Sequence, residues 1–453
     1  MHRPDQADDR GVVGMSFVEY PEYKGSGVQW LGEVPSNWKI GRLKHLLRIR
    51  GGQDYKSVES YVPTDFPVIG SGGQFTYATD YLYDGESVLL GRKGTIDKPL
   101  YVKGKFWTVD TMFYTEVLPG TNGRYAYYLA TTIPFDLYST NTALPSMSQF
   151  DLANHGLPLP PKCEQTQIAR FLDHETAKID ALIREQERLI ELLQEKRQAV
   201  ISHAVTKGLD PDVPMKDSGV EWLGEVPAHW IVARIKNFAR VESGHTPDKK
   251  KEEYWVDCDI PWVSLNDSKQ LKKADYIADT STKVNDLGIA NSSARLLPAA
   301  AVVFTRDASI GLSAITTKPM AVSQHLIAWL CAGEKLVPEY LLLIFYAMES
   351  EFERYTFGAT IKTIGMDDVR SLTAAFPPME EQKQLVTWAF RKKETLQAGL
   401  DAAEKTILLL KERRSALISS AVTGKIDVRN WQPPADEGAF DEEVRAVGME
   451  ATA

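Results

Sequence analysis

Two short polar loops carry side chains whose types and spacing suit contacts to a nucleic acid. Residues 91–96 read GRKGTI directly after the apolar run SVLL, and residues 305–311 read TRDASIG directly after AVVF. The alignment of the two loops pairs Arg92 with Arg306 and Thr95 with Ser309. An arginine on a rigid turn, beside a hydroxyl and open backbone N–H groups, suits contacts to phosphate or to guanine. For one copy alone, a β-turn whose arginine pairs with a nearby carboxylate is the better explanation, whereas two copies in register leave both interpretations open.

Two further pairs of loops are rich in amides and hydroxyls, which are the groups that read base edges. One pair follows the apolar runs PVI (67–69) and PWV (261–263), and the other pair, 141–148 and 358–365, stands just before two Pro-Pro steps. The first of these pairs differs between the copies, as two readers of different sequences should. Together with the arginine loops they give the candidate DNA-binding residues Ser71, Gln74, Thr76, Arg92, Lys93, Thr95, Ser146, Ser148, Ser264, Asn266, Ser268, Lys269, Arg306, Ser309, Lys362 and Thr363, and Gln324 beside His325 is a further candidate.

The sequence offers little for catalysis. It contains no G-x-x-x-x-G-K-[ST], no H-E-x-x-H and no G-x-S-x-G, so nucleotide-motor, metalloprotease and serine-hydrolase chemistry have no motif. The run WQPP (431–434) only superficially resembles the motif of adenine methyltransferases. Glu164 and the pair Glu380–Glu381 suit the N-termini of helices better than an acid–base pair, and His325 beside an apolar run is more often structural.

Three cysteines, far apart in the chain, argue against a disulfide framework and against a zinc site. Cys163, Cys258 and Cys331 are odd in number, which is typical of reduced thiols in a cytoplasmic protein. No run of about 18 apolar residues is present, so no membrane span is expected. We therefore predict a cytoplasmic protein that is not an enzyme and holds no metal and no cofactor of its own.

The chain contains an internal repeat of two copies of one unit. Residues 26–38 read SGVQWLGEVPSNW and residues 218–230 read SGVEWLGEVPAHW, with ten of thirteen letters identical at an offset of 192. Two later segment pairs, LPPKCEQTQIARFLD with FPPMEEQKQLVTWAF and RQAVISHAVTKG with RSALISSAVTGK, repeat at an offset of 217. The second unit thus carries about 25 extra residues in its first part, as a repeat does when its surface loops take insertions. The Trp, Leu, Val and Pro residues of the repeated phrase suit packing, so we expect the phrase to anchor each globular part to the helix that follows.

Each unit is expected to consist of a globular part and a long helix. Short apolar runs bounded by Gly, Asp or Ser predict strands, and interspersed helical patterns give an α/β (α+β) domain. The predicted segments are an N-terminal extension (1–22), a first recognition domain (23–160), a first spacer helix (161–208), a second recognition domain (209–376), a second spacer helix (377–425) and an acidic C-terminal tail (426–453). Because the repeated phrase begins soon after Met15, that residue would be a natural start.

Both long helices have clear start and stop signals. Pro-Pro precedes each, Gly208 and Gly424 follow, and residues 164–204 contain neither Gly nor Pro. At about 1.5 Å per residue, a helix of roughly 40 residues would be about 60 Å long. The apolar stripes are Ile168, Leu172, Ile179, Leu182, Leu189, Leu193, Val200 and Ala204 in the first helix, and Leu385, Trp388, Leu396, Leu400, Ala403, Ile407, Leu410, Leu417 and Ala421 in the second. They predict that the two helices pair as an antiparallel coiled coil; the alternative is that each helix packs on its own domain.

The net charge of −9 lies mostly at the two ends of the chain. Residues 1–22 and 426–453 carry −3 and −5, so the body is nearly neutral. Because phosphate contacts dominate DNA affinity, a neutral body predicts weak DNA binding without help from partner subunits.

These features together resemble the specificity subunit of Type I restriction–modification enzymes over nearly the whole chain. The resemblance is carried by the duplicated S-G-V-x-W-L-G-x-V-P-x-x-W, the loops GRKGTI and RDASIG, the two P-P-x-x-E-Q helix starts and the two A-V-T endings. One departure is Asp97, where a glycine commonly follows G-T-I in the family.

The resemblance implies two target recognition domains that read the half-sites of a bipartite DNA target, held apart by the two antiparallel helices. It also implies two modification subunits that bind S-adenosylmethionine and methylate adenines, and restriction subunits that need ATP and Mg²⁺, with no active site in this chain. Two alternatives remain. One is a stand-alone DNA-binding regulator of bipartite sites, and the other is a coiled-coil scaffold that binds no DNA.

Overall fold

The computed structural model describes residues 18–135, 138, 146–357 and 362–434. The chain divides into two compact units, one formed by residues 1–186 with 405–453 and the other by residues 187–404. Most of the predicted N-terminal extension and of the acidic tail therefore lies outside the described residues. The division passes through both long helices, so each unit contains part of each helix.

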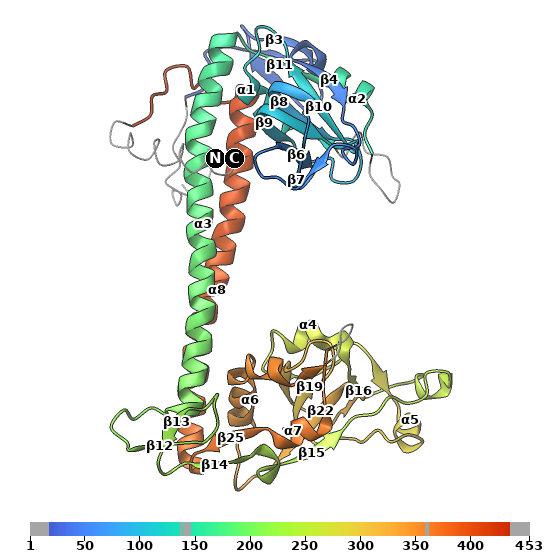
Figure 1. Ribbon diagram of the computed structural model, residues 1–453, viewed down its shortest axis with the longest axis vertical. Helices are drawn as coiled ribbons and strands as arrows, with labels where there is room; N and C mark the ends of the chain where they lie inside the picture. The colour runs from blue at the N-terminus through green and yellow to red at the C-terminus, as the bar shows by residue number, and fades with distance from the viewer. Residues whose placement is uncertain (1–17, 136–137, 139–145, 358–361, 435–453) are drawn as a thin grey trace, which may run out of the picture. The chain divides into compact units, whose positions relative to one another are not determined.

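The core of the first unit is a seven-stranded sheet in the order β4-β10-β8-β9-β6-β7-β5 (Figure 1). Only β6 and β9 are parallel neighbours. The strands are β4 (Leu47–Gly51), β5 (Glu59–Ser60), β6 (Phe66–Gly70), β7 (Gly73–Ala78), β8 (Tyr83–Gly91), β9 (Leu100–Thr108) and β10 (Met112–Val117). Two small antiparallel pairs flank the sheet, β1 (Tyr23–Gly25) with β2 (Glu33–Pro35), and β3 (Lys39–Arg42) with β11 (Gly156–Leu159). Helix α1 (Gly123–Ala130) packs against β8 and β9, and α2 (Gln149–Asn154) packs near β4.

The second unit repeats this plan with a divided sheet. Five strands lie in the order β15-β22-β19-β20-β17 and three more in the order β18-β16-β21. The strands are β15 (Ala239–Ser243), β16 (Ile260–Val263), β17 (Tyr276–Ile277), β18 (Lys283–Val284), β19 (Val302–Thr305), β20 (Ser313–Thr316), β21 (Ala321–Val322) and β22 (Leu326–Cys331). Around them lie β12 (Met215–Asp217) with β13 (Glu225–Pro227), β14 (Ile231–Arg234) with β25 (Thr373–Phe376), β23 (Thr356–Phe357) with β24 (Thr363–Ile364), and the helices α4 (Ser268–Leu271), α5 (Asp286–Ala290), α6 (Pro338–Ala347) and α7 (Met366–Ser371).

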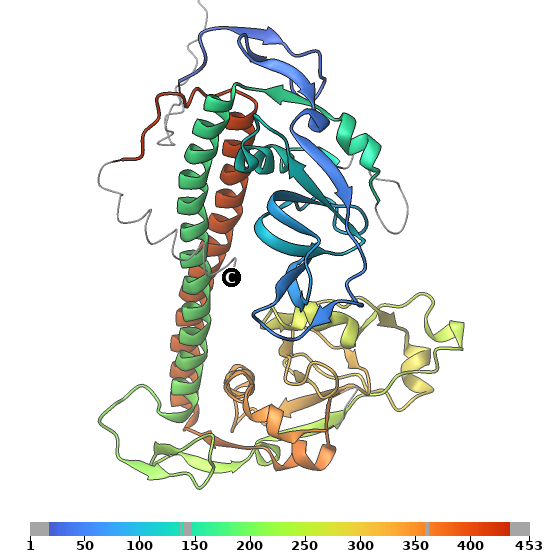
Figure 2. The same cartoon turned by 45° about the horizontal axis from the view of Figure 1, so that its top comes forward.

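The predicted long helices are α3 (Lys162–Thr206) and α8 (Met379–Val422). Gly208 and Gly424, which follow them, both have φ of +75°, the left-handed conformation that glycine adopts most easily at a helix C-terminus. Within each unit the two helices lie side by side (Figures 1 and 2). No helix of the described residues is both long enough and apolar enough to cross a membrane.

The contacts between the helices give their direction. In the first unit Arg414 Nε donates to Asp180 Oδ1 at 2.9 Å, and Gln167 reaches the carbonyl of Val428 beyond the end of α8. In the second unit Arg197 donates to Gln397 Oε1 at 3.1 Å. Positions that rise along α3 thus meet positions that fall along α8, so the pairing is antiparallel, as predicted.

The predicted stripe of α3 is wrong near its middle. Leu182 and Leu189 are 52% and 41% exposed, whereas Ile183 is buried. The prediction advanced in steps of three, four or seven residues and stepped by three from Ile179 to Leu182, whereas the buried face continues by four to Ile183. The buried face therefore moves to neighbouring positions, while the stripe of α8 keeps Leu385, Leu400 and Ala421 buried.

The outer ends of the helices belong to the globular cores. Ile168 and Leu172 of α3 pack with Ala421 and Val422 of α8 in the same apolar cluster as Tyr125 of α1. In the second unit the end of α3 and the start of α8 join the cluster that contains α6. The sequence offered pairing between the helices and packing of each helix on its own domain as alternatives. In the structure both occur.

Candidate nucleic-acid interface

In the first unit, the arginine loop (residues 91–96) lies at the end of β8. There it meets residues 146–148, the described end of the loop before the Pro-Pro step. The backbone N–H groups of Arg92 and Lys93 donate to the carbonyl of Thr111 at 2.9 and 3.1 Å. Met147 N donates to the Arg92 carbonyl at 3.0 Å, and Lys93 forms a β-bridge with Ser146. A Cβ on Gly91 would lie 2.3 Å from the Thr95 carbonyl oxygen, so the tight return of this loop requires glycine.

The second unit builds the same arrangement from different side chains. Arg306 N donates to the His325 carbonyl at 2.9 Å, and Ile364 N donates to the Arg306 carbonyl at 3.0 Å. Asp307 forms a β-bridge with Thr363, as Lys93 does with Ser146. Ala308 has φ of +63° where the aligned Gly94 has +80°, so the loop keeps its left-handed turn without glycine. The arginine loop and the loop before the Pro-Pro step, which the sequence singled out separately, are therefore brought together in each unit.

A polar cluster surrounds Asp307 in the second unit. His325 Nδ1 lies 2.7 Å from Asp307 Oδ2, and the Thr363 hydroxyl donates to Asp307 Oδ1. Gln324 Nε2 lies 3.2 Å from His325 Nε2, and Gln324 Oε1 accepts a hydrogen bond from Thr246. The sequence missed three of these residues: Thr246 and Asp307 were not candidates, and His325 was interpreted as structural. Their position on adjoining strand ends is what unites them, and only the register of the sheet could have shown it.

The two arginines differ in their surroundings. Arg92 is exposed, with Nη1 3.4 Å from the Asp110 carbonyl oxygen. The Arg306 side chain is only 26% exposed and its Nε lies 3.8 Å from Asp307 Oδ1. Arg306 Nε is buried and finds no hydrogen-bond acceptor among the described residues. The carboxylate-paired turn considered from the sequence therefore fits Arg306 in part, while Arg92 has the exposed guanidinium that a phosphate contact needs.

In four candidate residues the side-chain hydroxyl forms a hydrogen bond with the backbone of the fold. Ser264 is 6% exposed, and its hydroxyl accepts from Asn266 N at the start of a 3₁₀ turn. Ser148 accepts from Asp151 N as the N-cap of α2. The hydroxyls of Ser268 and Thr76 donate to the carbonyls of Leu265 and Ser60. These hydrogen bonds explain the four residues as structural, and we omit them from the proposed DNA contacts.

The other candidates divide by location. Arg92, Lys93, Thr95, Ser146, Arg306, Ser309, Gln324, Lys362 and Thr363 lie on the converging loops. Gln74, Asn266 and Lys269 are exposed on other elements, and Ser71 is half-buried in the turn between β6 and β7. Parts of the third loop pair, residues 141–145 and 358–361, lie outside the described residues.

The repeated phrase fixes each domain to its helix in the same way. Trp38 Nε1 and Asn37 Nδ2 both donate to Glu164 at 2.8 Å, and Trp230 Nε1 donates to Glu381 at 2.9 Å. Both indole rings are fully buried. Tyr20 also donates to Glu164, and burial together with this carboxylate raises the pKa of its phenol. The repeated phrase therefore contacts the start of the helix that follows each globular part, as expected from its packing residues.

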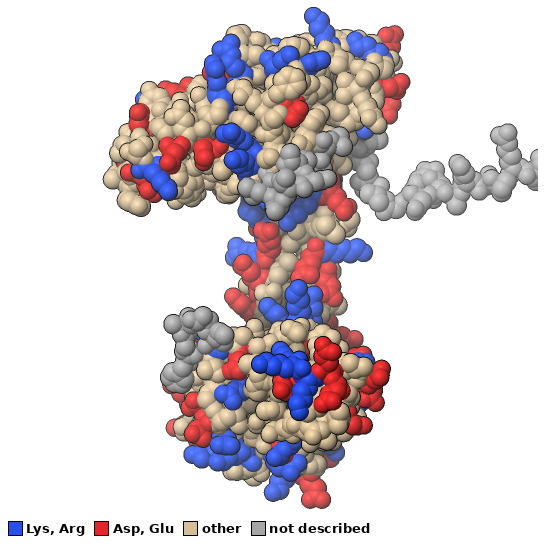
Figure 3. Space-filling view, turned by 90° about the vertical axis from the view of Figure 1, so that its right-hand side faces the viewer, with Lys and Arg blue, Asp and Glu red and all other residues tan. Residues whose placement is uncertain are grey.

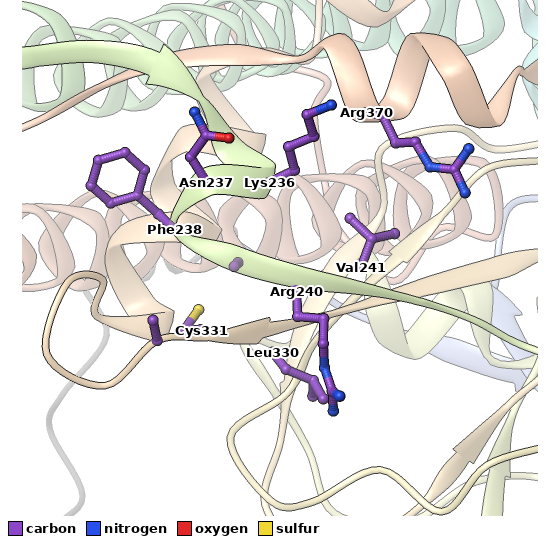
Figure 4. A pocket seen from close by; sticks show the side chains of 10 residues that line it. Lys236, Asn237, Phe238, Arg240, Val241, Leu330, Cys331 and Arg370 are labelled. Carbon is purple, nitrogen blue, oxygen red and sulfur yellow. The ribbon is translucent and has the colours of Figure 1, made fainter.

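An open hollow of the second unit does not form a ligand pocket. It has a volume of about 640 Å³ and is lined by Lys236, Arg240 and Arg370 around β15 (Figure 4). Burial raises the pKa of the Cys331 thiol at its base to about 12, so this thiol stays protonated and unreactive. A small-molecule site needs depth and convergent polar groups, which this hollow lacks. Within the described ranges, no three His, Cys, Asp or Glu side chains gather as metal ligands.

Charge on the surface is mixed in sign. Figure 3 shows Lys and Arg interspersed with Asp and Glu on the drawn face of each unit, with no continuous basic surface. Such a distribution agrees with the nearly neutral body found in the sequence.

Comparison with known proteins gives the family. A family model described as the Type I restriction modification DNA specificity domain matches residues 35–192 and 227–389. These matches cover well over half of the chain, which therefore belongs to this family. It is a specificity subunit with two target recognition domains, and specificity subunits are not themselves catalytic.

Individual relatives agree with this assignment. The MjaVIII specificity subunit of Methanocaldococcus jannaschii is 21% identical over 92% of this chain and 99% of its own length. The MjaIX specificity subunit of the same organism is 27% identical, but the match covers 36% of this chain and only 38% of that relative. A solved structure from a study of complex assembly and conformational transition of the type I R-M system shares the fold, with a TM-score of 0.63 and 17% identity, over 87% of this chain and 99% of its own.

Proposed function

We propose that this chain reads a bipartite DNA target, one half-site through each unit, for a restriction–modification complex. The observation that carries the proposal is the pair of converging loops, built with the same backbone contacts in both units around Arg92 and Arg306. The side chains on this shared frame differ, with an exposed arginine and lysine in one unit and an Asp–His–Thr–Gln cluster in the other. A fixed frame with different polar groups suits the recognition of two different short sequences.

Catalysis and cofactors then belong to partner subunits. Modification subunits would supply S-adenosylmethionine, and restriction subunits would use ATP and Mg²⁺. The middle part of the helices offers apolar surface for such partners, because Leu182, Leu408 and Leu409 of the first unit are each more than half exposed. Exposed leucines mark a protein–protein contact where they form a continuous apolar patch.

Replacing Arg92 or Arg306 with alanine is expected to weaken methylation of target DNA while the complex still assembles. Loss of one arginine contact to a base or phosphate costs about 1–3 kcal/mol, which is about 5- to 150-fold in affinity. The effect should be measured as the DNA concentration needed for half-maximal methylation by purified complexes. Arg48→Ala, which removes another exposed arginine of the first unit, is the matched control. Unchanged methylation by both variants would remove the two arginines from the interface.

The isolated chain is expected to bind its target DNA weakly, and this separates the proposal from a stand-alone regulator. With few phosphate contacts, its dissociation constant at physiological salt should stay in the micromolar range typical of non-specific binding. Addition of the modification subunit should tighten binding at least tenfold. A salt titration of both samples measures this, and tight, sequence-specific binding by the chain alone would favour the regulator. If DNA had no effect on the chain or on its assembly with partners, the scaffold alternative would be supported instead.

A further inference from the structure

The segment after α8 covers one face of α3 in the first unit. Gln167 Nε2 donates to the carbonyls of Val428 and Trp431, at 3.1 and 2.6 Å. The Trp431 ring packs edge-on against Phe171, with ring centroids 5.3 Å apart, and lies 5.2 Å from His174. A glutamine, an aromatic ring four residues later and a third side chain three residues after that thus form a seat for a short extended segment.

The repeat places the same seat on α8 in the second unit. Counting from the shared Glu-Gln pair, Gln384 corresponds to Gln167, Trp388 to Phe171 and Arg391 to His174. These three residues, together with Glu380, Lys383 and Thr387, line an open groove of about 410 Å³. Among the described residues, the Gln384 side chain makes no hydrogen bond, and no segment lies where Trp431 lies in the first unit. The groove therefore corresponds to the site on α3 that the segment around Trp431 fills in the first unit, but in the second unit it is open.

Among the described residues, no segment of the chain supplies this occupant. Eight residues, 207–214, join α3 to β12, and none of them lines the groove. The described residues therefore leave the groove open to another polypeptide.

We propose that this groove binds an extended segment of a partner polypeptide that carries an aromatic side chain next to a carboxylate. Gln384 would hold two backbone carbonyls, as Gln167 does, and Trp388 would pack against the aromatic ring. Arg391 stands where the first unit has His174, and a guanidinium favours a carboxylate at this position. Lys383 adds little charge because it is paired with Glu380 at 2.6 Å. The proposal needs a partner polypeptide, such as the proposed function supplies, but it does not depend on DNA.

The test uses a fluorescent peptide with the sequence of residues 425–434, KIDVRNWQPP, which fits the seat of the first unit. Anisotropy measured with the full chain, without DNA, should show one saturable site with a dissociation constant on the order of 0.1–1 mM, since a short peptide lacks the effective concentration of a tethered segment. A second peptide with the change Asn430→Asp places a carboxylate next to the aromatic ring and should bind more tightly. A third peptide with the change Trp431→Ala should not bind.

Variants of the chain locate the site. Gln384→Ala should weaken peptide binding about five- to tenfold, as expected for lost hydrogen bonds, and Arg391→Glu should reverse the preference for the peptide with the added carboxylate. Gln167→Ala is the matched control and should leave binding unchanged. Absence of saturable binding, binding that is insensitive to Gln384→Ala, or binding that depends on Gln167 would each overturn the proposal. None of these outcomes touches the methylation pattern, so failure here is distinct from failure of the proposed function.

Discussion

Exchanging residues 23–160 for the matching segment of a relative with another target is expected to change one half of the methylated motif and to leave the other half intact. The sheet of the first unit and its converging loops lie within this segment, while those of the second unit lie entirely in residues 187–404. Because each unit carries its own frame and its own reading side chains, the specificity of one half-site should move with the segment. Methylome sequencing of cells that contain the exchanged chain and the modification subunit measures the result.

The repeated phrase provides the matched control for this exchange. Replacing residues 26–38 with the sequence of residues 218–230 changes only three side chains, Gln29→Glu, Ser36→Ala and Asn37→His. The histidine can replace Asn37 as a donor to Glu164, because His229 contacts Glu381 in the second unit at 2.8 Å. Both half-sites should then stay as they were. If the domain exchange altered both halves, the two units would not read independently.

Trp230→Ala is expected to destabilise the second unit by about 3–5 kcal/mol, the usual cost of removing a large aromatic side chain from a core. Trp230 is fully buried, donates to Glu381, and packs beside Gly208 at the end of α3. One side chain therefore joins the globular part of this unit to both of its helix segments. Trp230→Phe keeps most of the packing but leaves Glu381 without its indole donor, which should cost about 1–3 kcal/mol.

Hydrogen exchange, measured separately over residues 187–404 and over the first unit, reports this loss. Protection should fall mainly in the second unit, and Trp38→Ala should have the reciprocal effect on the first. Trp255→Phe is the control, since the Trp255 side chain makes one hydrogen bond in an exposed position. Undiminished protection of the second unit in Trp230→Ala would show that the repeated phrase does not anchor the domain.

The duplicated frame was predictable because it rests on strong local signals. Pro-Pro, Glu-Gln and the closing glycines marked both helices, and the apolar character of the repeated phrase indicated packing. The sequence did not show which partners pack, so the specific bonds from Trp38 to Glu164 and from Trp230 to Glu381 emerged only from the structure. The middle of α3 was misassigned because steps of three and of four residues both fit a helical stripe, and the prediction took Leu182 where the buried face continues to Ile183.

The candidate site was predicted less completely. The loops that carry Arg92 and Arg306 were found from their repetition, but a polar side chain in a loop is equally suited to reading DNA and to closing a turn. Ser148 and Ser264 each precede an aspartate by three residues, which is the spacing of a capping box, and this signal could have marked both as structural. The cluster of Thr246, Asp307 and His325 depends on which strand ends lie together, a property of sheet register that single-sequence patterns do not give.

Methylome sequencing of cells that carry this chain with its modification subunit tests the central claim most directly. Cells with the modification subunit alone serve as the control. We predict methylated adenines that appear only when the chain is present, in one motif with two specified halves separated by an unspecified gap of constant length. A single uninterrupted motif, or the same methylation without the chain, would contradict the claim that its two units read a bipartite target.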